Sequence, residues 1–226
     1  MKFSRHAWGK QGMTRPRIHP LGDTALVCEA APPATLDCQR RIWALADKAR
    51  LMPHVVEVVP GMNNLTIVFD PLTADYDTLA AQLEAGWDAA DVAQEAGAEI
   101  DIPVIYDGPD LADVAKQANL TIDEVVKRHS KAEYIVFFLG FQPGFAYLGG
   151  LDPSIHTPRR AEPRMEVPAG SLGIGGAQTG IYPATSPGGW QLIGRTELKL
   201  FDPSRHPPTL MQSGDRVRFR ATEVRA

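Results

Sequence analysis

Glycine and proline are concentrated in one stretch of this chain to a degree that few folds accommodate. Between Gly140 and Trp190, eleven of 51 positions are Gly and seven are Pro. This density is otherwise typical of disordered segments, which are poor in aromatic residues. Here aromatic residues interrupt the stretch at positions 141, 145, 147, 182 and 190. The combination predicts short strands joined by tight turns and folded around a pocket.

The residues on either side extend this prediction to a domain at 98–226. A strand is expected at 100–106, followed by a helix at 110–118. A second helix is expected from Thr121 to about His129, because Thr121 and Glu124 have the spacing of a capping box. A strand at 134–139 comes next, and no helical periodicity follows it up to Arg220. This order favours a β-barrel or a β-sandwich.

Residues 18–97 predict a separate domain, preceded by a flexible lead-in at 1–17. The turn at 60–64 joins two β-type runs, and one apolar helical face is formed by Cys38, Ile42, Leu45, Ala46 and Ala49. The expected order is a strand at 24–30, a helix to about residue 51, strands at 54–59 and 65–69, and a helix at about 75–95. This order is ferredoxin-like in outline and places the chain in the α+β class.

Charge is distributed unevenly along the chain. Residues 1–137 carry 13 Lys and Arg against 20 Asp and Glu, a formal net charge of −7, whereas residues 138–226 carry ten against seven, or +3. An anionic ligand is therefore expected in the second domain. The basic excess is too small, and too poor in basic runs, to indicate nucleic acid.

Cysteine usage and hydropathy indicate the compartment. The two cysteines, Cys28 and Cys38, imply no disulfide framework and favour a reducing compartment. The first residues lack the apolar core of a signal peptide, and nothing approaches the ~20 apolar residues of a membrane span. A cytoplasmic protein without membrane contact is predicted.

The cationic side chains of the second domain are candidates for binding an anion, because a guanidinium binds carboxylate or phosphate with two parallel hydrogen bonds. The set comprises Arg159, Arg160, Arg164, Arg195 and Lys199. Arg164 and Arg195 each adjoin a turn motif and are therefore preferred. Each arginine alone is also compatible with an ordinary solvated surface position.

The glycine-rich run at 168–180 could turn backbone N–H groups onto an anion, yet it excludes several familiar sites. Gly175 and Gly180 have the spacing of a phosphate-binding loop, but Ile181 stands where that loop requires Lys. Ser171 is not in the G-x-S-x-G context of a hydrolase nucleophile. Gln178 and Thr179 are predicted to hydrogen-bond a ligand, with a turn-stabilising role as the alternative.

Two further features each allow both a functional and a structural interpretation. Pro143-Gly144 suits a type II turn that places Phe145 and Tyr147 on a pocket wall, or that is merely structural. His129 is a candidate general acid or base, and equally a residue interacting with the helix dipole. The six histidines show no metal-binding spacing, so no metal site is predicted.

Four ordered motifs resemble the allophanate hydrolase subunit 1 family, which includes the B-subunit proteins of 5-oxoprolinase and KipI-type kinase inhibitors. They read FFLGFQPGFAYLGGLDP, PRRAEPRMEVPAGSLGIGGAQTGIYP, SPGGWQLIGRT and LFDP followed by SGDRVRFR. The resemblance covers roughly residues 18–220. It implies a ferredoxin-like N-terminal domain followed by a cyclophilin-like β-barrel domain.

The resemblance also implies a function: one subunit of an ATP-dependent 5-oxoprolinase, inactive alone and working with the C and A subunits of that enzyme on a small anionic lactam. ATP with Mg is then expected at the assembled complex, and this chain has no biotin-attachment motif. The residues expected to be catalytic are His129, Arg164 and Arg195. Those expected to bind substrate are Phe145, Tyr147, Gln178, Thr179, Tyr182 and Trp190.

Two other functions stay open on the same motifs. A KipI-type protein would bind a sensor histidine kinase and perform no chemistry, presenting aromatic side chains to its partner. A carboxyltransferase component of the allophanate hydrolase or urea carboxylase type would need biotin carried by another protein.

Overall fold

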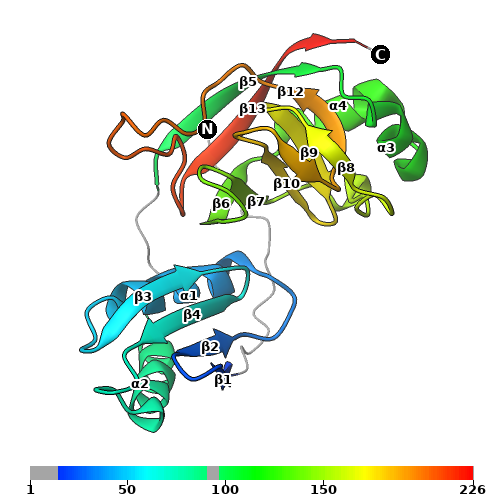
Figure 1. Cartoon of the computed structure of the whole chain (residues 1–226). Helices are drawn as coiled ribbons and strands as arrows, with labels where there is room; N and C mark the ends of the chain where they lie inside the picture. Colours follow the sequence, from blue (N-terminus) through cyan, green and yellow to red (C-terminus); the bar gives the residue numbers. More distant parts are fainter. Residues whose placement is uncertain (1–14, 91–96, 226) are drawn as a thin grey trace, which may run out of the picture. The chain divides into compact units, whose positions relative to one another are not determined.

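The computed structural model describes residues 15–90 and 97–225, and the chain divides into two compact units, Met1–Ala93 and Gln94–Ala226 (Figure 1). Most of the expected lead-in at 1–17 lies outside the described residues, as do residues 91–96, just before the expected domain boundary at 97/98. Arg17, expected in the lead-in, already belongs to a strand. Each unit is described below by itself.

The first unit is a sheet with two helices. Its strands follow the order β1-β2-β4-β3, and all neighbours are antiparallel. The elements are β1 (Arg17–Leu21), β2 (Ala25–Glu29), α1 (Leu36–Ala49), β3 (Val55–Pro60), β4 (Asn64–Phe69) and α2 (Tyr76–Asp88). All but β1 follow the predicted order. One hydrophobic core contains side chains from β2, β4 and both helices, so the helices cover the same face of the sheet.

Side-chain caps fix where the helices of this unit begin. Thr35 Oγ1 accepts a hydrogen bond from the backbone N–H of Cys38 at 3.1 Å, and Asp75 Oδ2 accepts one from Thr78 at 2.9 Å. Strands β2 and β3 lie on either side of β4 and are joined through α1, as in a split β-α-β unit. The place beside β2 is taken by β1, which precedes it in the chain. The ferredoxin-like label therefore stays a prediction.

The second unit is a closed barrel with the strand order β10-β7-β6-β13-β5-β12-β9, which confirms the predicted barrel and the α+β class. Its strands are β5 (Glu99–Tyr106), β6 (Tyr134–Leu139), β7 (Ala146–Gly149), β9 (Ser171–Gly175), β10 (Gln178–Ile181), β12 (Gln191–Arg195) and β13 (Arg216–Val224). Strands β8 (Arg164–Val167) and β11 (Ser186–Gly188) form a separate two-stranded ribbon. The label cyclophilin-like stays a prediction.

Helices α3 (Leu111–Ala118) and α4 (Ile122–Lys131) pack on the barrel and share its core, and a short 3-10 turn, η1 (Pro153–Ile155), lies beside them. The predicted capping box is present: Thr121 Oγ1 accepts from the backbone N–H of Glu124, whose carboxylate accepts from the N–H of Thr121. The predicted Pro143-Gly144 turn is closed by a 3.0 Å bond from Phe145 N–H to the Gln142 carbonyl, and Gly144 has a φ of +83°.

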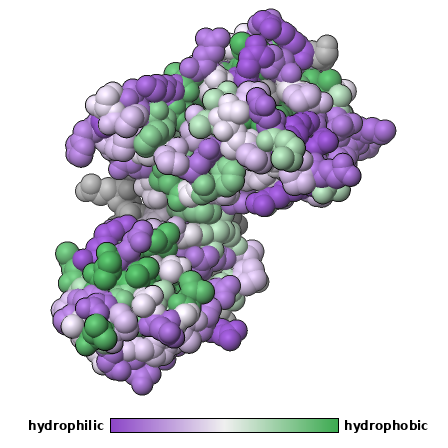
Figure 2. Space-filling view, viewed as in Figure 1, coloured by the Kyte–Doolittle hydropathy of each residue, from purple (hydrophilic) through white to green (hydrophobic). Residues whose placement is uncertain are grey.

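The exposed apolar residues, the lengths of the helices and the state of the cysteines each bear on the function of the chain. Figure 2 shows hydrophobic residues on the viewed face of the first unit. The exposed apolar side chains of this unit include Leu21, Val56 and Leu72. Within the described residues, none of the helices is both long and apolar enough to cross a membrane. Cys28 and Cys38 are both buried and free of any disulfide, as predicted.

Candidate functional site

Four of the predicted binding residues form one aromatic cluster, hereafter the aromatic cluster: Phe145, Tyr147, Tyr182 and Trp190. The ring of Phe145 lies 5.3 Å from that of Tyr182 and 5.4 Å from that of Trp190, both edge to face. Tyr147 contacts Trp190 at 5.8 Å. Phe145, Tyr182 and Trp190 are buried and Tyr147 is half-buried. Edge-to-face packing of this kind fixes the ring positions, so the cluster is a rigid wall.

The glycines of the β9–β10 hairpin make room for this wall. A Cβ on Gly175 would lie 2.5 Å from the indole of Trp190, and one on Gly180 would lie 2.8 Å from the Ala146 carbonyl oxygen. The sequence suggests that glycines of this run turn backbone N–H groups onto an anion. They instead let an aromatic side chain approach the backbone closely.

Arg159 lies over this cluster, with its guanidinium carbon 5.9 Å from the centre of the Trp190 ring. Burial raises the pKa of both Tyr147 and Tyr182. A hydrogen bond with the Trp190 backbone opposes the rise in the pKa of Tyr182, and the positive charge of Arg159 opposes it in both tyrosines. An exposed guanidinium therefore lies within electrostatic reach of two tyrosine hydroxyls.

A buried ion cluster lies next to the aromatic cluster. The Asp110 side chain, 3% exposed, accepts hydrogen bonds from Arg164 at 2.7 Å and from Arg160 at 3.1 Å through Oδ1. Its Oδ2 accepts from the backbone N–H of Leu192 at 2.6 Å. Asp110 is the N-cap residue of α3, but its side chain makes no cap bond. It joins α3, β8 and β12 instead.

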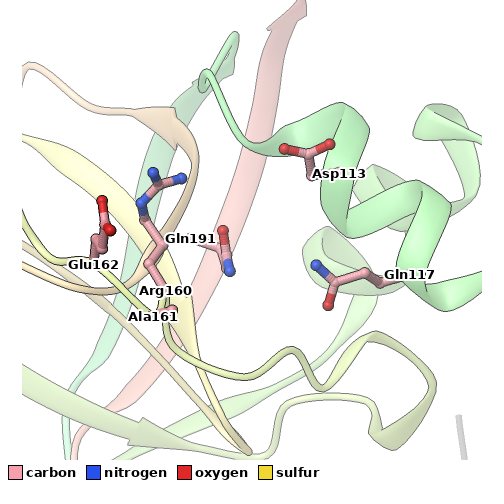
Figure 3. A pocket seen from close by; sticks show the side chains of 6 residues that line it. All are labelled: Asp113, Gln117, Arg160, Ala161, Glu162 and Gln191. Atoms are coloured by element: carbon pink, nitrogen blue, oxygen red, sulfur yellow. The ribbon is translucent and has the colours of Figure 1, made fainter.

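A surface pocket adjoins this ion cluster on the side of α3. Figure 3 shows Asp113 and Gln117 projecting from α3 toward Arg160 and Gln191 across the pocket. Its volume is about 370 Å³, and Ala161 and Glu162 complete the lining. The lining is almost entirely polar, so the pocket suits a small hydrophilic group rather than an apolar one.

The structure does not bring the two preferred arginines together. Arg164 pairs with Asp110, whereas Arg195, at the other end of β12, pairs with Asp107. Each guanidinium is thus paired with an aspartate, which Arg164 shares with Arg160. A guanidinium already engaged in an ion pair is a weaker ligand for a substrate anion than a free arginine.

His129 and Thr179 do meet, but inside the barrel. His129 is fully buried; its Nδ1 lies 2.8 Å from the Tyr106 hydroxyl and its Nε2 lies 3.0 Å from Thr179 Oγ1. Because Thr179 donates its own proton to the Gly173 carbonyl at 2.8 Å, it must accept from Nε2–H. The imidazole is therefore the neutral Nε2–H tautomer, and burial lowers its pKa to about 3. This geometry favours a structural role over proton transfer to a ligand.

Gln178 begins β10, and its Nε2 is buried without a hydrogen-bond partner among the residues that the structure describes. The residues present do not fit a nucleotide with Mg: the glycine-rich hairpin is filled by Trp190, and residues 15–90 and 97–225 contain no cluster of acidic, His or Cys side chains suited to a metal ion. No step through ATP is assigned to this chain.

Sequence reasoning missed Asp110 and did not single out Arg159. The sequence indicates Asp110 only as a helix start, yet this residue holds two arginines that lie 50 and 54 positions away. Arg159 belongs to the candidate set of five cations but was not preferred within it, although it lies over Trp190. The doublet Arg159-Arg160 was the available signal, since it offers one arginine to each of two neighbouring sites.

Comparison with known proteins agrees with this architecture. A family model for the carboxyltransferase domain, subdomain C and D, matches residues 16–211. The chain is 52% identical over 211 residues to a protein of Escherichia coli O157:H7 named as the B subunit of 5-oxoprolinase, covering 92% of this chain and 96% of that protein. A protein of the same name in Bacillus subtilis is 37% identical over 223 residues, covering 91% and 92%.

Solved structures show the same fold. The crystal structure of TTHA0988 matches with a TM-score of 0.76 and 35% identity, over 88% of this chain and 39% of that longer protein. The urea amidolyase of K. lactis matches with a TM-score of 0.75 and 22% identity, over 92% of this chain and 15% of that one. The second match shows the fold alone.

Proposed function

The chain belongs to the carboxyltransferase-domain family that contains the B-subunit proteins of 5-oxoprolinase, and we propose on that basis that it is the B subunit of an ATP-dependent 5-oxoprolinase. The observation that carries the proposal is the 52% identity to a protein of that name, over 96% of its length. The reaction opens the lactam ring of 5-oxo-L-proline to give L-glutamate. The chain is inactive alone in this proposal and works with the C and A subunits.

The aromatic cluster supports this assignment by its shape and chemistry. A lactam ring is small and flat, and it packs well against the half-buried ring of Tyr147, whose hydroxyl remains available as a donor. An amide as stable as a lactam needs activation, which ATP supplies in the assembled complex. Since the described residues do not fit a nucleotide, we assign ATP to another component of that complex.

The residues expected from the sequence take different parts in the proposal. Tyr147 offers the surface against which the substrate lies, and the buried rings of Phe145, Tyr182 and Trp190 hold it in place. Arg164 shapes the aromatic cluster through Asp110. His129 and Thr179 hold β10, and hence Gln178, from inside the barrel. Arg195 pairs with Asp107 away from the aromatic cluster and is assigned no part in the reaction.

Reconstitution tests the proposal. The chain is purified together with A and C subunits of a 5-oxoprolinase, and ATP-dependent formation of L-glutamate from 5-oxo-L-proline is measured. We expect turnover only when all three proteins are present. A complex that forms glutamate equally well without this chain, or that forms none when complete, would contradict the assignment.

A variant in the aromatic cluster connects the site with the activity. Tyr147 stacks on Phe138 with ring centres 4.3 Å apart and keeps part of its surface open. Tyr147→Ala removes ring contact from the substrate, so we expect the KM for 5-oxo-L-proline to rise about 10-fold. The KM for ATP should stay unchanged, because nucleotide is bound elsewhere. A rise in both would place the defect in assembly rather than in substrate binding.

The two other functions have less support. The relatives described above are named as B subunits of 5-oxoprolinase rather than as kinase inhibitors. The likeness to urea amidolyase, at 22% identity, concerns the fold and not the reaction. Co-purification with a sensor histidine kinase in place of the C-subunit protein would favour the inhibitor.

A further inference from the structure

Arg159 differs from the neighbouring arginines in its ion pairing. Arg160 and Arg164 share Asp110, and Arg195 pairs with Asp107. Arg159 forms no ion pair within the part of the chain that the structure describes, and its contact is the face of Trp190. Arg159 is thus the arginine beside the aromatic cluster that has no carboxylate partner among the described residues, whereas Arg160 and Arg164 share one.

The backbone on both sides of Arg159 is tied to the segment that carries Trp190. The carbonyl of Pro158 accepts a hydrogen bond from Gln191 Nε2 at 3.0 Å. The backbone N–H of Arg160 donates to the Gly189 carbonyl at 2.7 Å. These two bonds bracket Arg159 against residues 189–191, so its backbone is held beside the segment that carries the indole before any ligand binds. Such preorganisation lowers the entropy that binding must overcome.

The surroundings of Arg159 combine one free cation with aromatic surface. The side chain itself is exposed, while Tyr182 and Trp190 beneath it are buried. Its charge reaches the hydroxyls of both Tyr147 and Tyr182. A ligand that suits this arrangement carries one carboxylate for the guanidinium and a compact ring for the aromatic side chains.

We propose that Arg159 is the anion-binding residue of the aromatic cluster, taking the carboxylate of a small cyclic acid whose ring packs against the half-buried ring of Tyr147. The identity of that acid as 5-oxo-L-proline rests on the proposed function. Asp110 serves the same site from behind, because it holds both Arg160 and Arg164 in ion pairs, whereas the guanidinium of Arg159 is left without a carboxylate among the described residues. This replaces Arg164 and Arg195 as the residues that bind the carboxylate.

Direct binding to the full chain tests the proposal. Two probes are titrated by calorimetry: 5-oxo-L-proline, and 2-pyrrolidinone, which has the same lactam ring without the carboxylate. We expect saturable binding of 5-oxo-L-proline and binding of 2-pyrrolidinone that is weaker by about 10- to 100-fold, as the loss of a charge-assisted contact predicts. Arg159→Gln should weaken the binding of 5-oxo-L-proline by the same factor and leave the binding of 2-pyrrolidinone unchanged. Arg159→Lys should retain part of the affinity.

A matched control is Arg220→Gln on β13, which removes an exposed arginine that pairs with Asp101 at 3.1 Å. It should bind both probes as the unaltered chain does. Absence of saturable binding, or equal binding of 5-oxo-L-proline by Arg159→Gln and the unaltered chain, would overturn the proposal. Turnover by the reconstituted complex is measured separately. A complex without turnover, built on a chain with Arg159-dependent binding, would overturn the proposed function and leave this site standing.

Discussion

At the scale of single residues, Asp110 is the carboxylate near the site whose negative charge is expected to stabilise the fold most. Its side chain is 3% exposed and joins two arginines that are 35% and 23% exposed. Asp110→Asn keeps the shape but leaves both guanidinium groups without a counter-charge. We expect a loss of about 2–3 kcal/mol in the free energy of unfolding, below the cost of breaking a fully buried pair because the arginines stay partly hydrated.

The neighbouring pair supplies the comparison. Asp107 is 15% exposed and its partner Arg195 is 46% exposed, so the pair is screened by water. Asp107→Asn should cost less than about 1 kcal/mol. Urea denaturation of both variants measures the difference. Equal losses would show that the burial of Asp110 has no energetic consequence.

His129 predicts how stability depends on pH. Burial lowers its pKa in the folded state to about 3, whereas an unfolded histidine titrates near 6.5. Below pH 6.5 the unfolded state therefore binds a proton that the folded state does not. Stability is lost as pH falls from 6.5 toward 3, by up to about 1.4 kcal/mol per pH unit from this residue.

Nuclear magnetic resonance of the imidazole checks this prediction and the tautomer together. The nitrogen shifts of His129 should show the neutral Nε2–H form from pH 8 down to pH 5, because Tyr106 and Thr179 fix it. Titration of His129 within that range would contradict the buried network. It would also revive the residue as a proton carrier.

At the scale of secondary-structure elements, the β9–β10 hairpin depends on glycine for packing. Gly175→Ala places a methyl group 2.5 Å from the Trp190 indole, so either the hairpin or the ring must move. We expect a loss of about 1–3 kcal/mol in stability and a shifted indole resonance. Gly189→Ala, one residue before Trp190, meets nothing closer than 3.6 Å and should change stability by less than about 0.5 kcal/mol. Equal effects would mean that Trp190 is not held by the hairpin.

The elements were predictable where their signal is local. Helices α1 and α4 follow from apolar spacing and caps within a few residues, and the β3–β4 hairpin follows from its turn. Strand β1 was missed because its five residues include Pro20 and alternate weakly. Its edge position explains why proline is tolerated there. The ion cluster was missed because its members come from distant parts of the chain, and only the closed barrel brings Asp110 beside β8 and β12.

At the scale of the whole molecule, the separate hydrophobic cores predict separate unfolding. The cores share no residues, and both cysteines of the chain lie in the core of the first unit. Burial raises the pKa of Cys28 to about 12 and that of Cys38 to about 11, so neither forms the reactive thiolate near neutral pH while that unit is folded. Thiol labelling therefore reports the unfolding of the first unit alone.

Asp110→Asn acts in the second unit and should leave the thiol labelling of Cys28 and Cys38 unchanged. Pulsed thiol labelling across a urea series should give the same midpoint for the variant and the unaltered chain. Hydrogen exchange of β5, β9 and β12, measured in the same series, should show the barrel of the variant opening at lower urea. A labelling midpoint that shifts together with the barrel would mean that the units unfold as one. A constant labelling midpoint, together with a barrel that opens at lower urea, would mean instead that a change at the site on the barrel leaves the stability of the first unit unaffected.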